Sequence, residues 1–236
     1  MSFLAKLKAR FARKAKAEHS RRLAEGVSRP PWSWRAAACA VLIALAGIKL
    51  LPGGYVWSDV VAHLPMLGCV AFLTWRAGTG IGRAFGLARA RVGRVLASGL
   101  LLFLCESLLQ SAVTLLLLWL GLGGAHTEET RREARATLAS PFLFADASLL
   151  APFCEELTCR GLLYTSLRTR FNVAASVLGT AAVFALIHPY SFAESCPLFF
   201  AALISSLWYE RTRSLWPNII AHALNNTMTT FVMGSG

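Results

Sequence analysis

Residues 149–163 read LLAPFCEELTCRGLL, an apolar stretch that contains two adjacent glutamates, Glu155 and Glu156. A carboxylate in hydrocarbon is costly unless it is paired, hydrated or neutralised, and two adjacent carboxylates also repel each other. An ionisable residue inside an apolar span therefore indicates a functional site. Two later apolar segments carry further candidate residues: Phe184 and His188 in the first, and His222 and Asn226 in the second. We interpret the three segments as parts of one buried catalytic site.

The composition is that of a membrane protein. Of the 236 residues, 56% are hydrophobic and only 15% are charged, whereas soluble domains carry about 25% charged residues. A membrane-spanning helix needs about 20 apolar residues. We predict an all-α, polytopic membrane fold of about seven transmembrane helices that enclose a polar active-site cavity. The predicted spans are residues 36–51, 58–75, 95–122, 147–167, 172–190, 191–209 and 215–233.

The chain divides into three predicted segments. Residues 1–35 hold ten of the 24 Lys and Arg residues, and within residues 1–25 the apolar side chains recur at helical spacing. This pattern predicts a basic amphipathic helix that lies in the cytoplasm against a bilayer with anionic headgroups. Residues 36–146 hold the first transmembrane helices and their loops, and residues 147–236 form the catalytic transmembrane core. A nucleic-acid partner is not expected, because the basic arm belongs to a membrane chain.

The distribution of Lys and Arg predicts the orientation in the membrane. With the N-terminus in the cytoplasm, nineteen of these residues fall in segments on the inner side and three on the outer side. Basic residues in short loops favour the cytoplasmic side. The loop at 76–94 is then inside and the loop at 123–146 outside. Seven spans place the C-terminus outside, and the active-site cavity is expected to open to that face.

The spacing within each polar motif predicts which side chains meet. Glu156 and Arg160 are four residues apart and therefore share one helix face, where a guanidinium can keep a buried carboxylate ionised. Glu155 is rotated by about 100° and faces a different partner. Such a division gives two carboxylates different environments and leaves one of them free for proton transfer. A purely structural ion pair is the alternative interpretation of these residues.

The two later motifs supply histidine and amide groups. His188 precedes Pro189, which ends the helix and leaves backbone carbonyls free. His222 and Asn226 share a helix face and can hold a water molecule or donate to an oxyanion. Each motif taken alone is also compatible with ordinary packing, as is His63 in the second span, which we interpret as structural.

The three motifs together, EExxxR, FxxxH and HxxxN in this order on separate apolar helices, resemble those of the CPBP family of intramembrane proteases. The best-known members of that family are the type II CAAX prenyl endopeptidases. The resemblance extends from Leu149 to Thr230 and includes RGLLY at 160–164 and SLWP at 214–217. Position 192 is Phe, where prenyl proteases of the family often carry a polar residue. This difference weakens the prediction of a prenylated substrate more than that of a protease.

The resemblance implies a glutamic-type intramembrane peptidase. In the family pattern Glu155 is the general base for a water that His188 also holds, while His222 and Asn226 position the water or stabilise the oxyanion. The implied supporting residues are Glu156, Arg160 and Phe184. No cofactor is expected, although two histidines and a glutamate are also a possible zinc-ligand set. The sequence lacks HExxH and any close metal-ligand spacing, which favours the metal-free reaction.

The expected substrate is the C-terminal, membrane-anchored segment of another protein. The small size and the Ala- and Arg-rich composition are typical of bacteria, so we predict an enzyme of the bacterial inner membrane that takes part in protein sorting or processing. A CAAX-type prenyl protease is the alternative within the family. A non-catalytic immunity or scaffold protein and a proton-coupled transporter are alternatives of other classes. The transporter is disfavoured because we find no internal repeat.

Overall fold

The computed structural model describes residues 32–33, 35–39, 41–42, 56–87, 91–123, 128–188 and 190–235. Side chains are described for these residues except 56–62 and Glu129. The amphipathic helix predicted at residues 1–25 and most of the first predicted span, 36–51, lie outside the described residues.

Every regular element of the described residues is a helix, as predicted, and these residues contain no strand. The elements are α3 (Val56–Arg76), α4 (Ile81–Ala84), α5 (Val92–Trp119), α6 (Glu128–Ala139), α7 (Pro141–Ala145), η1 (Asp146–Leu150), α8 (Ala151–Glu156), η2 (Leu157–Tyr164), α9 (Thr165–Leu167), α10 (Val173–Ile187), α11 (Phe192–Thr212) and α12 (Trp216–Gly234). The all-α prediction is therefore confirmed for this part of the chain.

Helices α5 and α11 are long and apolar enough to cross a membrane. A third span is added if the helical segments Thr130–Ala139 and Pro141–Leu167, which meet at a bend of 107°, count as one broken span. Helix α10 is apolar but has only 15 residues. These helices identify an integral membrane protein, and seven spans stay a prediction.

The sequence-based prediction of a loop at 123–146 is wrong, because α6 and α7 occupy most of it. Helix α6 is highly charged, but one of its faces packs against the end of α12. A Cβ at Gly234 would lie 2.6 Å from the Leu138 side chain and 3.1 Å from the Ala134 backbone. Glycine thus lets the two helices approach closely, a tertiary contact that composition does not reveal. The predicted loop at 76–94 also contains a short helix, α4.

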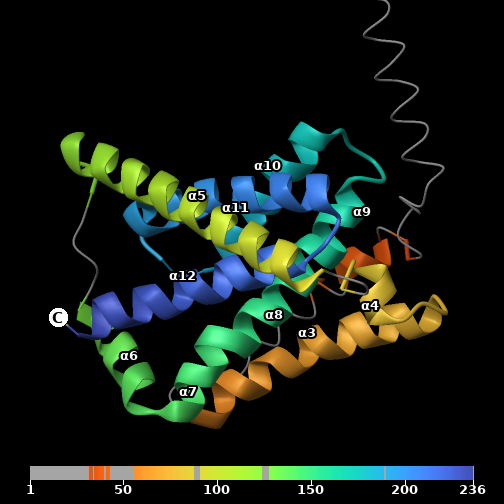
Figure 1. Cartoon of the computed structure of the whole chain (residues 1–236), viewed down its shortest axis with the longest axis horizontal. Helices are drawn as coiled ribbons and strands as arrows, with labels where there is room; N and C mark the ends of the chain where they lie inside the picture. The colour runs from red at the N-terminus through yellow and green to blue at the C-terminus, as the bar shows by residue number, and fades with distance from the viewer. Residues whose placement is uncertain are drawn as a thin grey trace, which may run out of the picture. The chain divides into compact units, whose positions relative to one another are not determined.

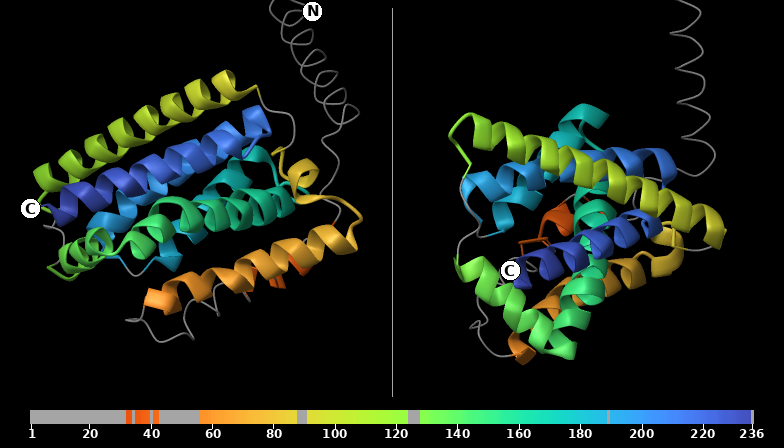
Figure 2. Two further views of the ribbon diagram at one scale, coloured as in Figure 1. Left: turned by 60° about the horizontal axis from the view of Figure 1, so that its bottom comes forward. Right: turned by 60° about the vertical axis from the view of Figure 1, so that its left-hand side comes forward.

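The helices follow one another in layers around the segment Pro141–Leu167. Helix α5 packs along α11 and α12, α12 packs against η1 and α8, and α3 packs against the other side of η1 and α8. The left view of Figure 2 shows this succession from α5 through α12 and the central segment to α3, and Figure 1 shows α10 beside α11. Polar residues on the central segment therefore face the interior of the bundle.

The central segment is one helical run that contains two π-helical stretches, η1 and η2, on either side of α8. A π turn holds one extra residue, and such turns are frequent at functional sites. At Gly161 in η2 the run meets the buried Phe85, and a Cβ there would come within 2.7 Å of the Phe85 ring. Glycine at this position lets the connection between α3 and α5 seal one side of η2.

Candidate active site

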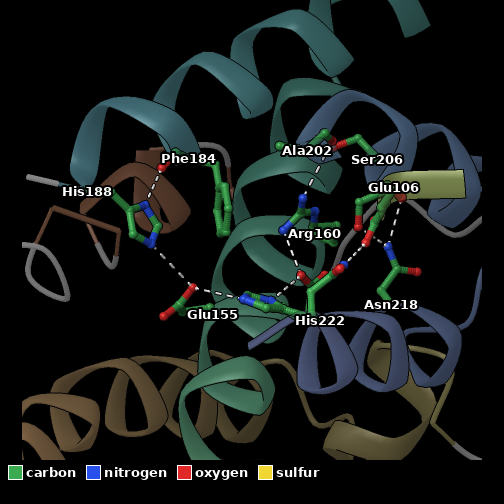
Figure 3. Close-up of polar contacts among 12 residues, drawn as sticks. Glu106, Glu155, Arg160, Phe184, His188, Ala202, Ser206, Asn218 and His222 are labelled. Carbon is green, nitrogen blue, oxygen red and sulfur yellow. Dashed lines mark hydrogen bonds and ion pairs between the residues drawn. The ribbon is translucent and has the colours of Figure 1, made fainter. Parts of the chain in front are cut away.

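Glu155 lies between two histidines from different helices. Its Oε2 atom is 3.9 Å from His188 Nε2 and 3.7 Å from His222 Nε2, as Figure 3 shows. The three side chains are 17%, 20% and 15% exposed. Oε2 has no hydrogen-bond partner among the described residues. Separations of this size are too long for a direct hydrogen bond but suit a water molecule between the groups.

His188 is oriented by the end of its own helix. Helix α10 stops at Ile187, and His188 has an extended backbone, as expected for a residue that precedes proline. The helix end removes the usual partner of the Phe184 carbonyl, and His188 Nδ1 lies 2.7 Å from that oxygen. A carbonyl only accepts, so Nδ1 carries the proton in this bond. In the neutral ring, Nε2 is then the acceptor that faces Glu155.

His222 is oriented by the second glutamate of the pair. Its Nδ1 atom lies 3.0 Å from Glu156 Oε1, and the same oxygen accepts from Arg160 Nη1 at 2.7 Å. Glu156 and Arg160 are both only 1% exposed, so the ion pair predicted from their spacing is present and buried. The carboxylate accepts from Nδ1–H, and the neutral His222 ring therefore also turns an acceptor Nε2 towards Glu155.

Phe184 joins the three motifs. Its ring lies under the Arg160 guanidinium, with Cζ 4.7 Å from the ring centroid. The centroids of the His188 and His222 rings are 4.9 and 5.8 Å from it. A cation over an aromatic face is stabilised by the ring quadrupole. The phenyl ring thus fixes the spacing between the Glu156–Arg160 pair and the two histidines.

Asn226 is placed beside the site but is already engaged. Its Nδ2 atom donates to the Ala147 carbonyl in η1 at 3.0 Å, which ties α12 to the central segment. An amide carries two N–H donors, so this bond leaves one of them for another acceptor. The structure therefore brings Glu155, His188 and His222 together with Glu156, Arg160 and Phe184, while Asn226 lines the cavity beside His222 and is bonded to the backbone of η1.

Two buried acidic residues were missed by the sequence analysis. Glu106, in the middle of α5, is 4% exposed and accepts from Asn225 Nδ2 at 2.8 Å. Asp146 lies 3.3 Å from His63 Nδ1, and both residues are buried. The signal was available for Glu106, since a carboxylate in an apolar span is itself unusual. Asp146 was assigned to a polar loop, so its pairing with His63 was not expected.

A cavity of about 720 Å³ leads to the site between α5, α6, α11 and α12. Its lining includes Glu106, Glu156, Phe184, His222 and Asn226. Glu155 and His188 are not among the lining residues. The cavity therefore reaches the site on its His222 side, and its volume is in the range of sites that bind small ligands or short peptide segments.

Comparison with protein families matches residues 136–228 to the Rce1-like family, described as type II CAAX prenyl endopeptidase Rce1-like. No curated protein and no solved structure matches the chain. The matched residues include all three motifs and every candidate site residue from Glu155 to Asn226. The family implies a membrane protease with a protein substrate. The match at residues 136–228 is to the family that the three motifs predicted, the type II CAAX prenyl endopeptidases.

Proposed function

We propose that the protein is a glutamic-type intramembrane endopeptidase that hydrolyses a peptide bond in or near the membrane-anchored C-terminal segment of another protein. The observation that supports this proposal best is the position of Glu155 Oε2 between the Nε2 atoms of His188 and His222, at 3.9 and 3.7 Å. Because both Nδ1 atoms are held by acceptors, each neutral ring has an Nε2 that can accept beside Glu155 Oε2. A water bound there donates one proton to Glu155 and the other to one of the two histidines, and presents its oxygen lone pairs to a substrate.

Glu155 is the proposed general base. As the water oxygen bonds to the peptide carbonyl carbon, Glu155 takes one water proton and the carbonyl electrons move onto the carbonyl oxygen. When the C–N bond breaks, Glu155 returns its proton to the leaving nitrogen, so the carboxylate is regenerated. His188 and His222 align the water, and a base within hydrogen-bond reach of a bound water is the geometry that such catalysis needs.

The oxyanion formed in this step needs a donor. Asn226 has a second N–H beyond the one bonded to Ala147, and it lines the cavity beside His222. We assign this N–H to the oxyanion. Glu156 and Arg160 do not take part in proton transfer: their buried pair holds the His222 ring in the tautomer that keeps Nε2 free of hydrogen.

The side-chain positions fit a metal-free reaction better than a zinc site. Two histidines and a glutamate are a suitable donor set, but zinc bonds of about 2.0–2.1 Å place tetrahedral ligand atoms roughly 3.4 Å apart. The separations here are larger. Within the part of the chain that the structure describes, no group of three or more His, Cys, Asp or Glu residues is arranged to hold a metal ion. We therefore derive no step through a metal.

The proposed substrate is an unprenylated membrane anchor of a bacterial surface protein, cleaved in the inner membrane. Phe192, at the position where prenyl proteases of the family often carry a polar residue, is exposed at the start of α11. The proposed arrangement has seven spans, a cytoplasmic N-terminus and a site that opens to the outer face. The family's own description favours the second candidate, a CAAX-type prenyl protease.

Two quenched fluorescent peptides, offered to the detergent-purified protein, test the function. One spans an apolar helix and its polar C-terminal flank, and the other ends in a farnesylated CAAX sequence. We expect cleavage of the first, complete loss with Glu155→Ala, and full activity in excess chelator. Cleavage of the farnesylated peptide alone would support the prenyl protease. If neither peptide is cut, or if a chelator abolishes activity and zinc restores it, the proposal is wrong in its function or in its mechanism respectively.

A further inference from the structure

Helix α5 carries a carboxylate where none is expected. Glu106 lies at the midpoint of the 28-residue apolar helix Val92–Trp119 and is its only acidic residue. It is buried, lines the cavity and interacts electrostatically with Glu156, Arg160 and His222. A buried polar group in a membrane helix is costly and usually functional. Glu106 is outside the residues 136–228 that match the family, so the family match assigns it no role.

The contacts of Glu106 explain its position. Asn225 of α12 donates from Nδ2 to Glu106 Oε2 at 2.8 Å, and the neighbouring Ser107 donates to Asn225 Oδ1 at 3.1 Å. Two consecutive residues of α5 therefore hold both ends of one amide. Both bonds depend on the rotation of α12 about its own axis, because a roll of the helix would move the Asn225 amide away from both partners at once.

Asn225 lies in the HxxxN motif, three residues after His222 and directly before Asn226. Residues three and four apart share a helix face. Asn226 is bonded to Ala147 on the central segment, so α12 is held by an amide on each of two sides. One amide is bonded to α5 and the other to η1, and His222 lies one turn before both.

The two helices approach each other closely one heptad before Glu106. A Cβ at Gly99 would lie 2.7 Å from the Ile220 side chain and 3.3 Å from the Pro217 carbonyl. This contact brings α5 and α12 together but does not fix their rotation, because apolar contacts have no preferred direction. The hydrogen bonds at Glu106 and Ser107 provide the directional part of the interface.

We propose that Glu106, with Ser107, is a positioning residue that sets the roll of α12 through Asn225 and thereby holds His222 Nε2 towards Glu155. This inference rests on the proposed function for its kinetic consequences. A side chain about 6 Å from a helix axis moves about 1 Å for a roll of roughly 10°. A displacement of that size in a catalytic group can lower a rate by about 100-fold.

The kinetic test compares Glu106→Leu with Glu106→Gln. The glutamine keeps an oxygen that accepts from Asn225, and the leucine does not. We expect Glu106→Leu to lower kcat by about 10- to 100-fold with KM within about twofold, and Glu106→Gln to stay within about threefold of the wild type. Ser98→Ala is the matched control, since it removes a bond from α5 to Trp208 of α11 (2.9 Å) and leaves α12 untouched. Wild-type kcat in Glu106→Leu, or equal losses in both Glu106 variants, would overturn the proposal.

A second readout does not depend on proteolysis. The ring nitrogens of His222, labelled with ¹⁵N and assigned by comparison with His222→Gln, report the bond to Glu156. We expect their chemical shifts to change in Glu106→Leu and to be preserved in Glu106→Gln and Ser98→Ala. Unchanged shifts in Glu106→Leu would contradict the positioning role. If the wild type cleaves no peptide, the proposed function fails, and the shifts still decide whether Glu106 positions His222.

Discussion

Helices α8–α12 and helices α3 and α5 contribute different kinds of residue to the same polar interior. The first group lies within the family match, except for the end of α12, and supplies the carboxylate and the two histidines that face each other. The second group precedes the match and supplies Glu106 and His63, which pair with Asn225 and Asp146 of the matched residues. The groups assigned to the reaction thus come from motif-bearing helices, and part of their support comes from helices without a motif. The polar interior therefore extends beyond the matched residues.

Among the residues of these two groups of helices, substitutions of Glu155 and His188 are expected to lower turnover most. Loss of a general base typically costs about 10²–10⁴ in rate, and Glu155→Gln and His188→Ala should each reduce turnover to this extent or to background. Because both are proposed to hold the same water, the double variant should be no slower than the slower single variant. The test measures the turnover of one peptide by the wild type, the two single variants and the double variant. Losses that multiply would show that the two residues do not share a water.

A smaller effect is expected at Asn226, which ties α12 to the central segment. Asn226→Ala removes the proposed oxyanion donor and the tie to Ala147, so kcat should fall by about 10²–10³. Thr227→Val is the matched control on the next position of α12, because Thr227 bonds only to the Ala223 carbonyl of its own helix among the contacts identified. Equal activity of the two variants would show that Asn226 does not donate to the oxyanion.

The smallest kinetic effect is expected in the supporting helix α3. His63→Leu leaves Asp146 buried without this histidine, which we expect to lower the free energy of unfolding by about 3 kcal/mol. Asp146 lies about two and a half helical turns before Glu155 along the central segment, so kcat of the folded protein should stay within about threefold of the wild type. Thermal unfolding and turnover, measured on one preparation, separate the two quantities. A large loss of kcat with unchanged stability would show that His63 takes part in catalysis and is not only structural.

The sequence predicted the residues of the candidate site better than the residues and helices that pack around it. The i, i+4 spacing predicted the Glu156–Arg160 pair, and Pro189 predicted the helix end that exposes the Phe184 carbonyl to His188. Both depend on local geometry, which sequence spacing determines. The meeting of the three motifs was predicted from resemblance, since no spacing rule places residues 155, 188 and 222 together.

The missed features depend on tertiary contacts. Glu106 was hidden in an apolar span, although the rule that singled out Glu155 applies to it equally. Helix α6 was assigned to a loop because its composition is charged, and its packing against Gly234 was not visible in the sequence. The π-helical turns on either side of α8 have no residue pattern of their own.

The most direct test of the account compares Glu155→Gln with Glu156→Gln in one preparation. Turnover is measured on the same peptide, and unfolding is followed by thiol labelling of the buried Cys154 and Cys159. The account predicts that Glu155→Gln loses turnover without loss of stability. Glu156→Gln should keep measurable turnover but unfold at lower temperature, because Arg160 is left buried without its carboxylate, at a cost of about 3–5 kcal/mol. The reverse pattern, an active Glu155→Gln and an inactive but stable Glu156→Gln, would contradict the assignment of Glu155 as the base.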